Sequence, residues 1–255
     1  MLNRVSLYFE PYGYKHLVRQ SAVLTVEGKQ EFIVFTPKVA GSSIKRQLLE
    51  QCGAYKDGTD IHRLLRSVNK GFGELGFARF NALIRNGDLA PFCLIRNPLD
   101  RFYSGFNDKI LNFYKTKSPS ARGYIEKQCS RMFAPNVLAR WVEDRDKPEI
   151  STDLSRKMFA AYCDYVLRTP CRLLDPHFAS QTVNLRLDLF VRARLYRLES
   201  FDAYCEALGL DMDQKRHENY SVKKLDLDAA EMNRLEDGIR KRFAGDIVVY
   251  EELCR

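Results

Sequence analysis

A strand–turn–helix pattern occurs twice in the first half of the chain, and it constrains the fold more than any other feature. The first copy has a predicted strand at Glu31–Phe35 with an apolar run from Phe32, the polar segment TPKVAGSS, and a predicted helix at Ile44–Cys52. The second has an apolar run at Pro91–Ile95, the turn Arg96-Asn97-Pro98, and a predicted helix through about residue 113. Uninterrupted apolar runs of this length are typical of parallel strands that are buried on both faces.

The rest of the chain continues this alternation of strands and helices. Further helices are predicted at residues 61–85, 120–132, 135–143, 153–166, 201–208 and 228–243, and a late strand at 187–191 that extends through 195–198. Buried strands alternating with helices predict an α/β fold with a central parallel sheet flanked by helices. At 255 residues, the chain has room for one large domain, which we place at residues 31–255; residues 1–30 have no role that the sequence reveals.

Composition restricts the partners and the compartment. With 41 basic against 33 acidic residues, the net charge is +8, which favours an anionic partner. The seven cysteines form no C-x-x-C pair, so we expect buried thiols in a reducing compartment. Charges and Pro11 interrupt the N-terminus, unlike a signal peptide, and no apolar stretch could span a membrane. We therefore expect a cytoplasmic protein without a transmembrane segment, which leaves peripheral contact with the cytosolic face of a membrane open.

The first loop has the features of a phosphate-binding turn. It follows a buried strand and opens a helix, which is where α/β sheets bind ligands and where backbone amides favour phosphate. Gly41 suits a tight turn, Lys38 adds a positive charge, and Ser42 and Ser43 add hydroxyl donors. Because Lys38 precedes the glycine, the loop is not a Walker A motif, and the chain holds no match to that motif.

The second loop offers a partner for a second phosphate. Arg96 ends the strand, and Ser104 follows eight residues later, nearly two turns into the predicted helix. A guanidinium and a hydroxyl from one strand–helix unit could hold a single phosphate. A structural alternative, in which Arg96 pairs with Asp100 or caps the turn, stays open at this point.

Together these two segments resemble the sulfotransferases that use 3′-phosphoadenosine 5′-phosphosulfate (PAPS). TPKVAGSSIKRQLL is similar to the family's 5′-phosphosulfate loop, P-K-x-x-G-[ST]-[ST]. LIRNPLDRFYSGFNDKI is similar to its 3′-phosphate segment, R-[DN]-P-x-x-R-x-x-S. The match is closest to the carbohydrate-type branch, which includes the chondroitin, dermatan and HNK-1 sulfotransferases and bacterial relatives. Weaker similarities follow in order at residues 175–181, 196–201, 217–221 and 243–250.

The resemblance implies a P-loop-like three-layer α/β fold and sulfuryl transfer from PAPS to a hydroxyl of a carbohydrate-like acceptor. It implies that Pro37, Lys38, Gly41, Ser42 and Ser43 bind the 5′-phosphosulfate, with Lys38 also stabilising the leaving group. Carried over in the same way, Arg96 and Ser104 bind the 3′-phosphate. No metal is expected. The expected partner is a glycan, a glycolipid or another hydroxylated acceptor, and no nucleic acid.

The general base is the least determined member of the site. His62 follows the phosphate loop, where related carbohydrate enzymes place a catalytic histidine, and His177 belongs to the P-H-F element. Both are candidate catalytic residues, and Asp60 or Glu74 could serve instead.

Three rival functions deserve comparison. A catalytically silent sulfotransferase-like protein that binds a nucleotide or anion would be indicated by loss of Lys38, Arg96 or Ser104, and all three are present. A nucleotide kinase would need a Walker A loop, and ATP has no 3′-phosphate for the second loop. A nucleic-acid-binding module would show one of the common RNA- or DNA-binding patterns, and none occurs.

Overall fold

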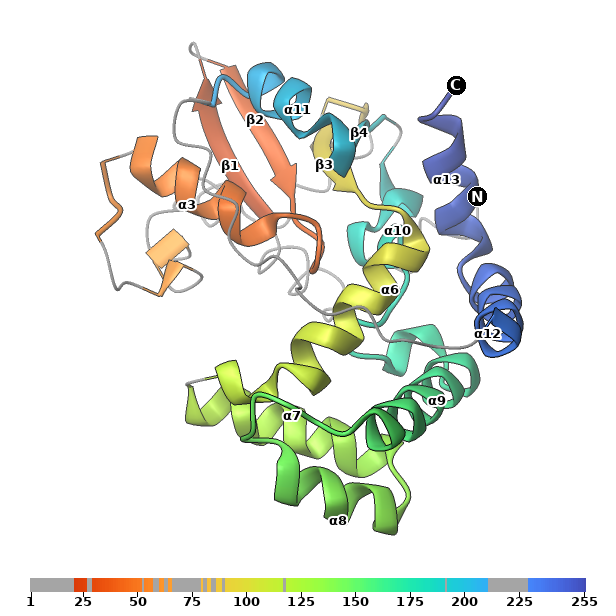
Figure 1. Cartoon of the computed structure of the whole chain (residues 1–255). Helices are drawn as coiled ribbons and strands as arrows, with labels where there is room; N and C mark the ends of the chain where they lie inside the picture. The colour runs from red at the N-terminus through yellow and green to blue at the C-terminus, as the bar shows by residue number, and fades with distance from the viewer. Residues whose placement is uncertain are drawn as a thin grey trace. The chain divides into compact units, whose positions relative to one another are not determined.

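The computed structural model describes residues 21–26, 29–51, 53–56, 60–61, 64–65, 79, 82–83, 86–88, 90–116, 118–190, 192–210 and 229–255. The chain divides into two units (Figure 1). The sheet unit comprises the described residues of Met1–Asn97, Ser180–Asn219 and Val249–Arg255. The helical unit comprises those of Pro98–Ala179 and Tyr220–Val248.

Four strands form the sheet of the sheet unit among the described residues, in the order β1-β2-β3-β4. They are β1 (Ser21–Val26), β2 (Lys29–Val34), β3 (Pro91–Ile95) and β4 (Arg194–Arg197). β2, β3 and β4 run parallel, with Phe32 opposite Pro91 and Phe92 opposite Arg194. β1 pairs antiparallel to β2. The predicted parallel sheet is therefore confirmed, and a hairpin strand from the segment before residue 31 extends it.

Alternating side chains of β2 and β3 fill two separate apolar layers, one on each face of the sheet. On one face, Ile33 and Phe92 pack in a cluster with Ile44 and Leu48 of α3 (Gly41–Gln51) and with Tyr204 of α11 (Phe201–Ala207). The other face packs against α10 (Gln181–Leu185) and the end of α13 (Ala244–Glu252); its cluster includes Phe32, Val34, Cys93, Ile95, Leu185, Val249 and Leu253. A strand buried on both faces must be apolar throughout, which explains why PFCLI carries no polar residue. The predicted α/β fold with helices on both faces is confirmed.

The helical unit has its own core, built largely from aromatic side chains. It contains α6 (Pro98–Phe106), α7 (Pro119–Met132), α8 (Pro135–Asp144), α9 (Thr152–Arg168) and α12 (Ala229–Arg242). Phe102 and Phe106 of α6 pack against Phe159 and Tyr162 of α9, with the rings of Phe102 and Tyr162 centred 4.6 Å apart. Trp141 of α8 is fully buried in the same core. Burying a side chain of this size stabilises a fold by about 1.5–3 kcal/mol, so these aromatics hold the helices together.

Two predicted elements differ from the structure. The helix expected from Pro98 to about Phe113 stops being α-helical at Phe106, because a π-helix (Asn107–Leu111) and a 3-10 turn (Phe113–Lys115) follow. The backbone N–H of Asn112 donates to the carbonyl of Asn107 at 2.8 Å, and the Asn112 side-chain amide donates to the same oxygen at 2.8 Å. These bonds favour the wider π-turn locally, and Ile110 and Phe113 are both buried in it.

The strand expected to begin at residue 187 is also wrong in its first part. Leu187–Leu189 form a 3-10 turn after Arg186, which has a left-handed φ of 52° and pairs with Asp188 at 3.1 Å. This left-handed residue turns the chain, so Leu187 packs on the sheet from a turn and β4 begins only at Arg194. Short 3-10 turns are also formed by Cys171–Leu173 and Leu198–Ser200.

The expectation of buried thiols is confirmed for four of the described cysteines. Cys93, Cys129, Cys163 and Cys205 are buried, Cys171 is half-buried and Cys254 is exposed. Burial raises the pKa of Cys93, Cys129 and Cys163 well above the ordinary range, so these thiols stay protonated. Every helix in the described part of the chain is too short or too polar to cross a membrane.

Candidate functional site

The loop between β2 and α3 has an unusual backbone. Lys38 and Ala40 both adopt left-handed conformations, with φ angles of 71° and 46°. Such conformations cost a non-glycine residue about 1–2 kcal/mol, and they concentrate at sites where the backbone shape has a function. In backbones where right-handed and left-handed residues alternate, successive N–H groups can point toward a common anion.

Gly41 does not carry the backbone strain of this turn. It is the first residue of α3 and has no positive φ, and a Cβ built on it would lie 3.7 Å from the carbonyl oxygen of Thr36. That distance is an ordinary contact, so the protein itself leaves room for a side chain there. The backbone strain of the turn lies instead at Lys38 and Ala40.

Several features of the loop suit a bound anion. α3 begins at Gly41, and its first turn contains no acidic residue that would repel an anion at the positive end of the helix. Pro37, Lys38, Ser42 and Ser43 are all half-buried around this helix start. Thr36 is 3% exposed, and its hydroxyl oxygen has no hydrogen-bond partner among the described residues. A phosphate-like oxygen could accept a bond from this hydroxyl, so the loop fits such a group.

Arg96 lies beside the same loop. It directly follows β3, and its Nη1 donates to the backbone carbonyl of Lys38 at 3.4 Å. The side-chain amide of Gln181, at the start of α10, fixes the Arg96 backbone by donating to its carbonyl at 2.8 Å and accepting from its N–H at 3.0 Å. The structure thus brings Lys38 and Arg96 together within the sheet unit.

Ser104 and His177 belong to the helical unit. Ser104 lies on α6 and is 8% exposed. One turn earlier, the buried guanidinium of Arg101 donates to the carbonyls of Pro176 and Ala179, both at 2.7 Å. Two charge-assisted bonds from one side chain fasten the loop that carries His177 to α6.

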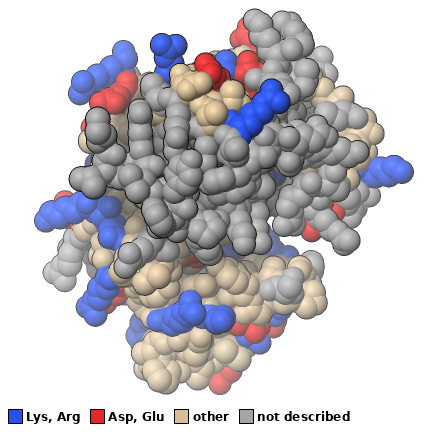
Figure 2. Space-filling model, turned by 180° about the vertical axis from the view of Figure 1, so that it is seen from behind, with Lys and Arg blue, Asp and Glu red and all other residues tan. Residues whose placement is uncertain are grey.

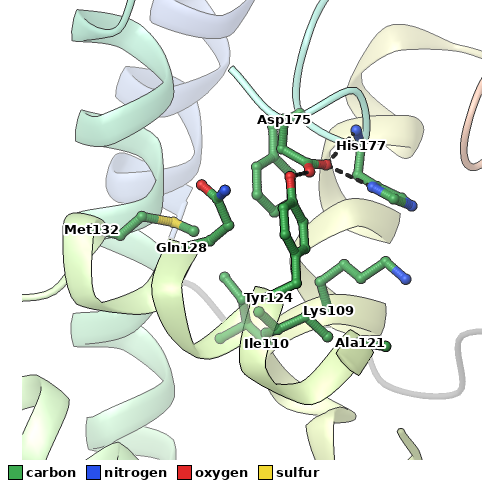
Figure 3. Close-up of a pocket in the computed structure, with 10 residues that line it drawn as sticks. Lys109, Ile110, Ala121, Tyr124, Gln128, Met132, Asp175 and His177 are labelled. Atoms are coloured by element: carbon green, nitrogen blue, oxygen red, sulfur yellow. Dashed lines mark hydrogen bonds and ion pairs between the residues drawn. The ribbon is translucent and has the colours of Figure 1, made fainter. Parts of the chain in front are cut away.

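His177 forms a close polar network with Asp175 and Tyr124 (Figure 3). One carboxylate oxygen of Asp175 lies 2.6 Å from Nδ1 of His177 and 2.7 Å from the His177 backbone nitrogen. The Tyr124 hydroxyl donates to the other oxygen. Burial alone would raise the pKa of Asp175, but the hydrogen bonds from His177 and Tyr124 outweigh it and lower the pKa to about 2.

An ionised Asp175 fixes the tautomer of His177. A carboxylate only accepts hydrogen bonds, so Nδ1 of His177 carries the proton that it donates to Asp175. In neutral imidazole this leaves Nε2 as the basic nitrogen. The His177–Asp175 pair therefore has the arrangement of a histidine that is oriented to accept a proton.

The other candidate bases are His62, Asp60 and Glu74. His62 and Glu74 lie outside the described residues, as does the late segment with His217. Asp60 is described and exposed.

Figure 2 shows the described basic side chains of this face in blue, several of them next to acidic side chains in red. Several arginines of the helical unit have carboxylate partners. Arg140 lies 3.3 Å from Asp153, and Arg145 lies 2.8 Å from Glu126. These partners neutralise much of the local charge.

Sequence reasoning missed several residues of this site. Lys45 is only 6% exposed, although lysines are mostly surface residues. Its ammonium lies 4.7 Å from the centre of the Phe35 ring. Thr36 and the Asp175–Tyr124 contact were also missed. The i, i+2 spacing of Asp175 and His177 was the available signal for that network.

Comparison with known proteins agrees with this architecture. The chain matches the family model described as "Sulfotransferase family" over residues 24–243. Neither a curated protein nor a solved structure matches the chain significantly. A match over most of the chain identifies the family, whose members transfer sulfuryl groups to hydroxylated acceptors. The chain therefore belongs to the sulfotransferase family.

Proposed function

We propose that the protein transfers a sulfuryl group from PAPS to a hydroxyl of a carbohydrate-like acceptor. In this proposal Pro37, Lys38, Gly41, Ser42 and Ser43 bind the 5′-phosphosulfate. Arg96 and Ser104 bind the 3′-phosphate, and His177 or His62 acts as the general base. The carbohydrate type of the acceptor is supported by the motif resemblance alone.

The observation that carries the proposal is the backbone of the loop after β2. Lys38 and Ala40 are left-handed, and the first turn of α3 contains no acidic residue. Both features favour binding of an anionic donor at this loop. Arg96, 3.4 Å from the Lys38 carbonyl, adds a second cation to the same loop. A purely structural turn would have little reason to retain two strained non-glycine residues.

The proposed chemistry needs little from the protein besides charge and positioning. The sulfur–oxygen bond to the 5′-phosphate breaks while a bond forms between sulfur and the acceptor oxygen. The acceptor proton moves to the base, and 3′-phosphoadenosine 5′-phosphate (PAP) leaves. Negative charge develops on the phosphate oxygen that leaves, so Lys38 would stabilise the transition state more than the ground state.

Among the candidate bases, the surroundings of His177 provide the better physical support. Asp175 holds Nδ1 and leaves Nε2 to accept a proton, and an ionised carboxylate stabilises the imidazolium that forms. Replacing His177 with Gln should then lower kcat strongly and remove the acidic limb of the pH–rate profile. The same substitution at His62 tests the other candidate, and the true base is the one whose loss removes that limb.

The first experiment is a calorimetric titration without metal, comparing PAP with AMP, ADP and ATP. We expect PAP to bind at least about tenfold more tightly than AMP, because its 3′-phosphate adds a charge-assisted contact. Equal binding of PAP and AMP would contradict the donor assignment. PAP binding without sulfuryl transfer to any of a panel of hydroxylated acceptors would favour the catalytically silent alternative.

Three variants separate the two phosphate roles. Lys38→Ala should weaken PAP and AMP alike and abolish sulfuryl transfer, because both nucleotides carry a 5′-phosphate. Arg96→Ala should weaken PAP binding by about tenfold to a hundredfold, and Ser104→Ala should weaken it less. Both variants should leave the affinity for AMP nearly unchanged. Wild-type turnover in Lys38→Ala would refute its assigned role.

A further inference from the structure

The helical unit contains a cavity of about 140 Å³ beside the His177–Asp175 pair (Figure 3). α7 contributes half of the residues that line it, and Tyr124, Gln128 and Met132 among them are spaced four residues apart and so share one face of the helix. The remaining wall residues come from the π-helix and from the loop that Arg101 holds; they are Lys109, Ile110, Asp175, His177 and Phe178, with Ala121 and Ile125 from α7.

The π-helix helps to shape this cavity. Lys109 and Ile110 lie within Asn107–Leu111, where the wider turn changes the direction of successive side chains. The ammonium of Lys109 lies 3.2 Å from Asp108, so its charge is already balanced. Insertions of this kind in α-helices occur frequently at functional sites.

One wall residue has a polar atom without a partner. Gln128 is only 8% exposed, and its side-chain carbonyl oxygen accepts no hydrogen bond from the described residues. Figure 3 shows the Gln128 amide projecting from α7 among the side chains that line the cavity. Burying an acceptor without a hydrogen bond costs free energy, so a hydrogen-bond donor inside the cavity would stabilise the Gln128 carbonyl oxygen.

Apart from Nε2 of His177 and the Lys109 ammonium, the polar groups of the wall leave little for a polar ligand to bind. Asp175 accepts from the backbone and ring nitrogens of His177 and from Tyr124, so both carboxylate oxygens have partners. The side chains of Ile110, Ile125, Met132 and Phe178 are apolar. A water molecule at Gln128 would find few further partners, and each extra hydroxyl of a sugar ring would lose its hydrogen bonds to water without replacement.

We infer that this cavity binds a single apolar ring that carries one hydrogen-bond donor, such as a phenol, with the donor directed at the Gln128 carbonyl oxygen. The volume agrees, since apolar cavities of about 150 Å³ hold a benzene ring. Tyr124 is 47% exposed, so a ligand has a route in from solvent along this side chain.

The ring site would anchor an apolar ring substituent of the carbohydrate-like acceptor beside His177, so the sugar itself would lie outside the cavity. That biological role rests on the proposed function, but the ring binding does not. All ring titrations are therefore run without PAPS. Their failure would overturn the cavity proposal, while the PAP titration remains the separate test of sulfuryl transfer.

The test is a fluorine NMR titration of the full chain with 4-fluorophenol, fluorobenzene and a fluorinated glucose. We expect 4-fluorophenol to bind about fivefold or more tightly than fluorobenzene, because one hydrogen bond to a buried acceptor separates the two probes. The glucose probe should not bind. Absence of binding by both aromatic probes, or tighter binding of glucose, would overturn the inference.

Two variants and one control locate the binding. Gln128→Met keeps the side-chain length and removes the acceptor, so it should abolish the preference for 4-fluorophenol and leave fluorobenzene binding equal or tighter. Ala121→Leu fills the cavity and should abolish binding of both probes. Lys127→Leu changes an exposed residue of the same helix and should change neither affinity.

The variants remain informative if one of them folds poorly. Thermal unfolding of each variant shows whether it is folded, and Ala121→Leu tests the site independently of Gln128. A preference for 4-fluorophenol that survives in folded Gln128→Met would overturn the assigned contact. Binding that survives in folded Ala121→Leu would place the probes elsewhere and overturn the site.

Discussion

The side-chain amide of Gln181 forms two hydrogen bonds with the backbone of Arg96, at 2.8 Å to its carbonyl oxygen and 3.0 Å from its N–H. This is the pattern that a neighbouring strand would supply, provided here by one fully buried side chain beyond the end of β3. It holds the backbone of Arg96 in place while the guanidinium of the same residue reaches the loop at Lys38.

Gln181→Leu should therefore impair both stability and nucleotide binding. The substitution keeps a similar volume but leaves the N–H and C=O of Arg96 without these partners, which costs about 1–3 kcal/mol for each buried group that stays unpaired. We expect a loss of several kcal/mol in the free energy of unfolding, measured by urea denaturation, and weaker PAP binding. Val183→Ala, on the exposed side of α10, should change neither quantity. Unchanged PAP affinity in a folded Gln181→Leu would show that Arg96 does not depend on this amide.

Ala40→Gly should stabilise the protein, which is unusual for an alanine-to-glycine change. Ala40 has a φ of 46°, and glycine adopts this conformation without the steric cost. After subtracting the greater entropy of glycine in the unfolded chain, we expect a gain of up to about 1 kcal/mol in the free energy of unfolding. The control is Ala54→Gly, at a position without positive φ in the same unit, which should lose about 0.5–1 kcal/mol. Loss of stability in Ala40→Gly as large as in the control would contradict the strain at Ala40.

A pair of glycine-to-alanine variants tests how closely the His177 loop packs on α6. A Cβ at Gly105 would lie 3.1 Å from the carbonyl oxygen of His177 and 3.3 Å from the hydroxyl of Tyr162. Because the first contact is with backbone, Gly105→Ala should cost about 1–3 kcal/mol of stability and should also lower kcat. Gly123 lies at an exposed position of α7 with no atom near a new Cβ. Gly123→Ala should therefore raise the free energy of unfolding by up to about 1 kcal/mol. Thermal and urea unfolding of both variants measure the difference, and equal effects would argue against the close packing.

The ionised state of Asp175 predicts a specific dependence of stability on pH. Its pKa falls from an ordinary 3.8 to about 2 in the folded protein, so the unfolded state binds its proton first as the pH decreases. The resulting contribution, about 2 kcal/mol, is fully present above about pH 4 and is lost as the pH falls toward 2.

Asp175→Asn isolates this contribution. The free energy of unfolding of the wild type and of Asp175→Asn should differ most at pH 5–6 and should converge as the pH falls toward 2. Chemical denaturation at pH 6, 4 and 3 is sufficient to follow the trend. A difference that stays constant over this range would mean that Asp175 has an ordinary pKa in the folded protein.

The parts of the fold that follow from periodicity could be predicted from the sequence. PFCLI and the run before TPKVAGSS are apolar throughout because both faces of their strands are covered, and this composition is visible without a structure. The helices α7, α8, α9, α11 and α12 were predicted to within a few residues, whereas α10 and α13 were not predicted. The α-to-π change at Asn107 could not be predicted, because it depends on hydrogen bonds of Asn112 that periodicity does not report.

The site shows the same division. Lys38 and Arg96 could be identified because they occupy the ends of predicted buried strands. The strain at Ala40 could not be predicted, because nothing in the sequence marks an alanine as left-handed. Gly41 was the residue expected to allow the tight turn. Gln181 was noted only as a motif residue; its contact with Arg96 joins residues 85 positions apart, which local patterns do not connect.

The composition of β4 bears on how the protein behaves in concentrated solution. Within the described sheet β4 is an outer strand of four residues, and arginines occupy both of its ends. Arg194 pairs with Glu31 and lies over the Phe92 ring, and Arg197 is half-buried beside Cys254. A short strand with a charge at each end is a poor template for another chain to extend, so this edge protects the sheet against aggregation through strand addition.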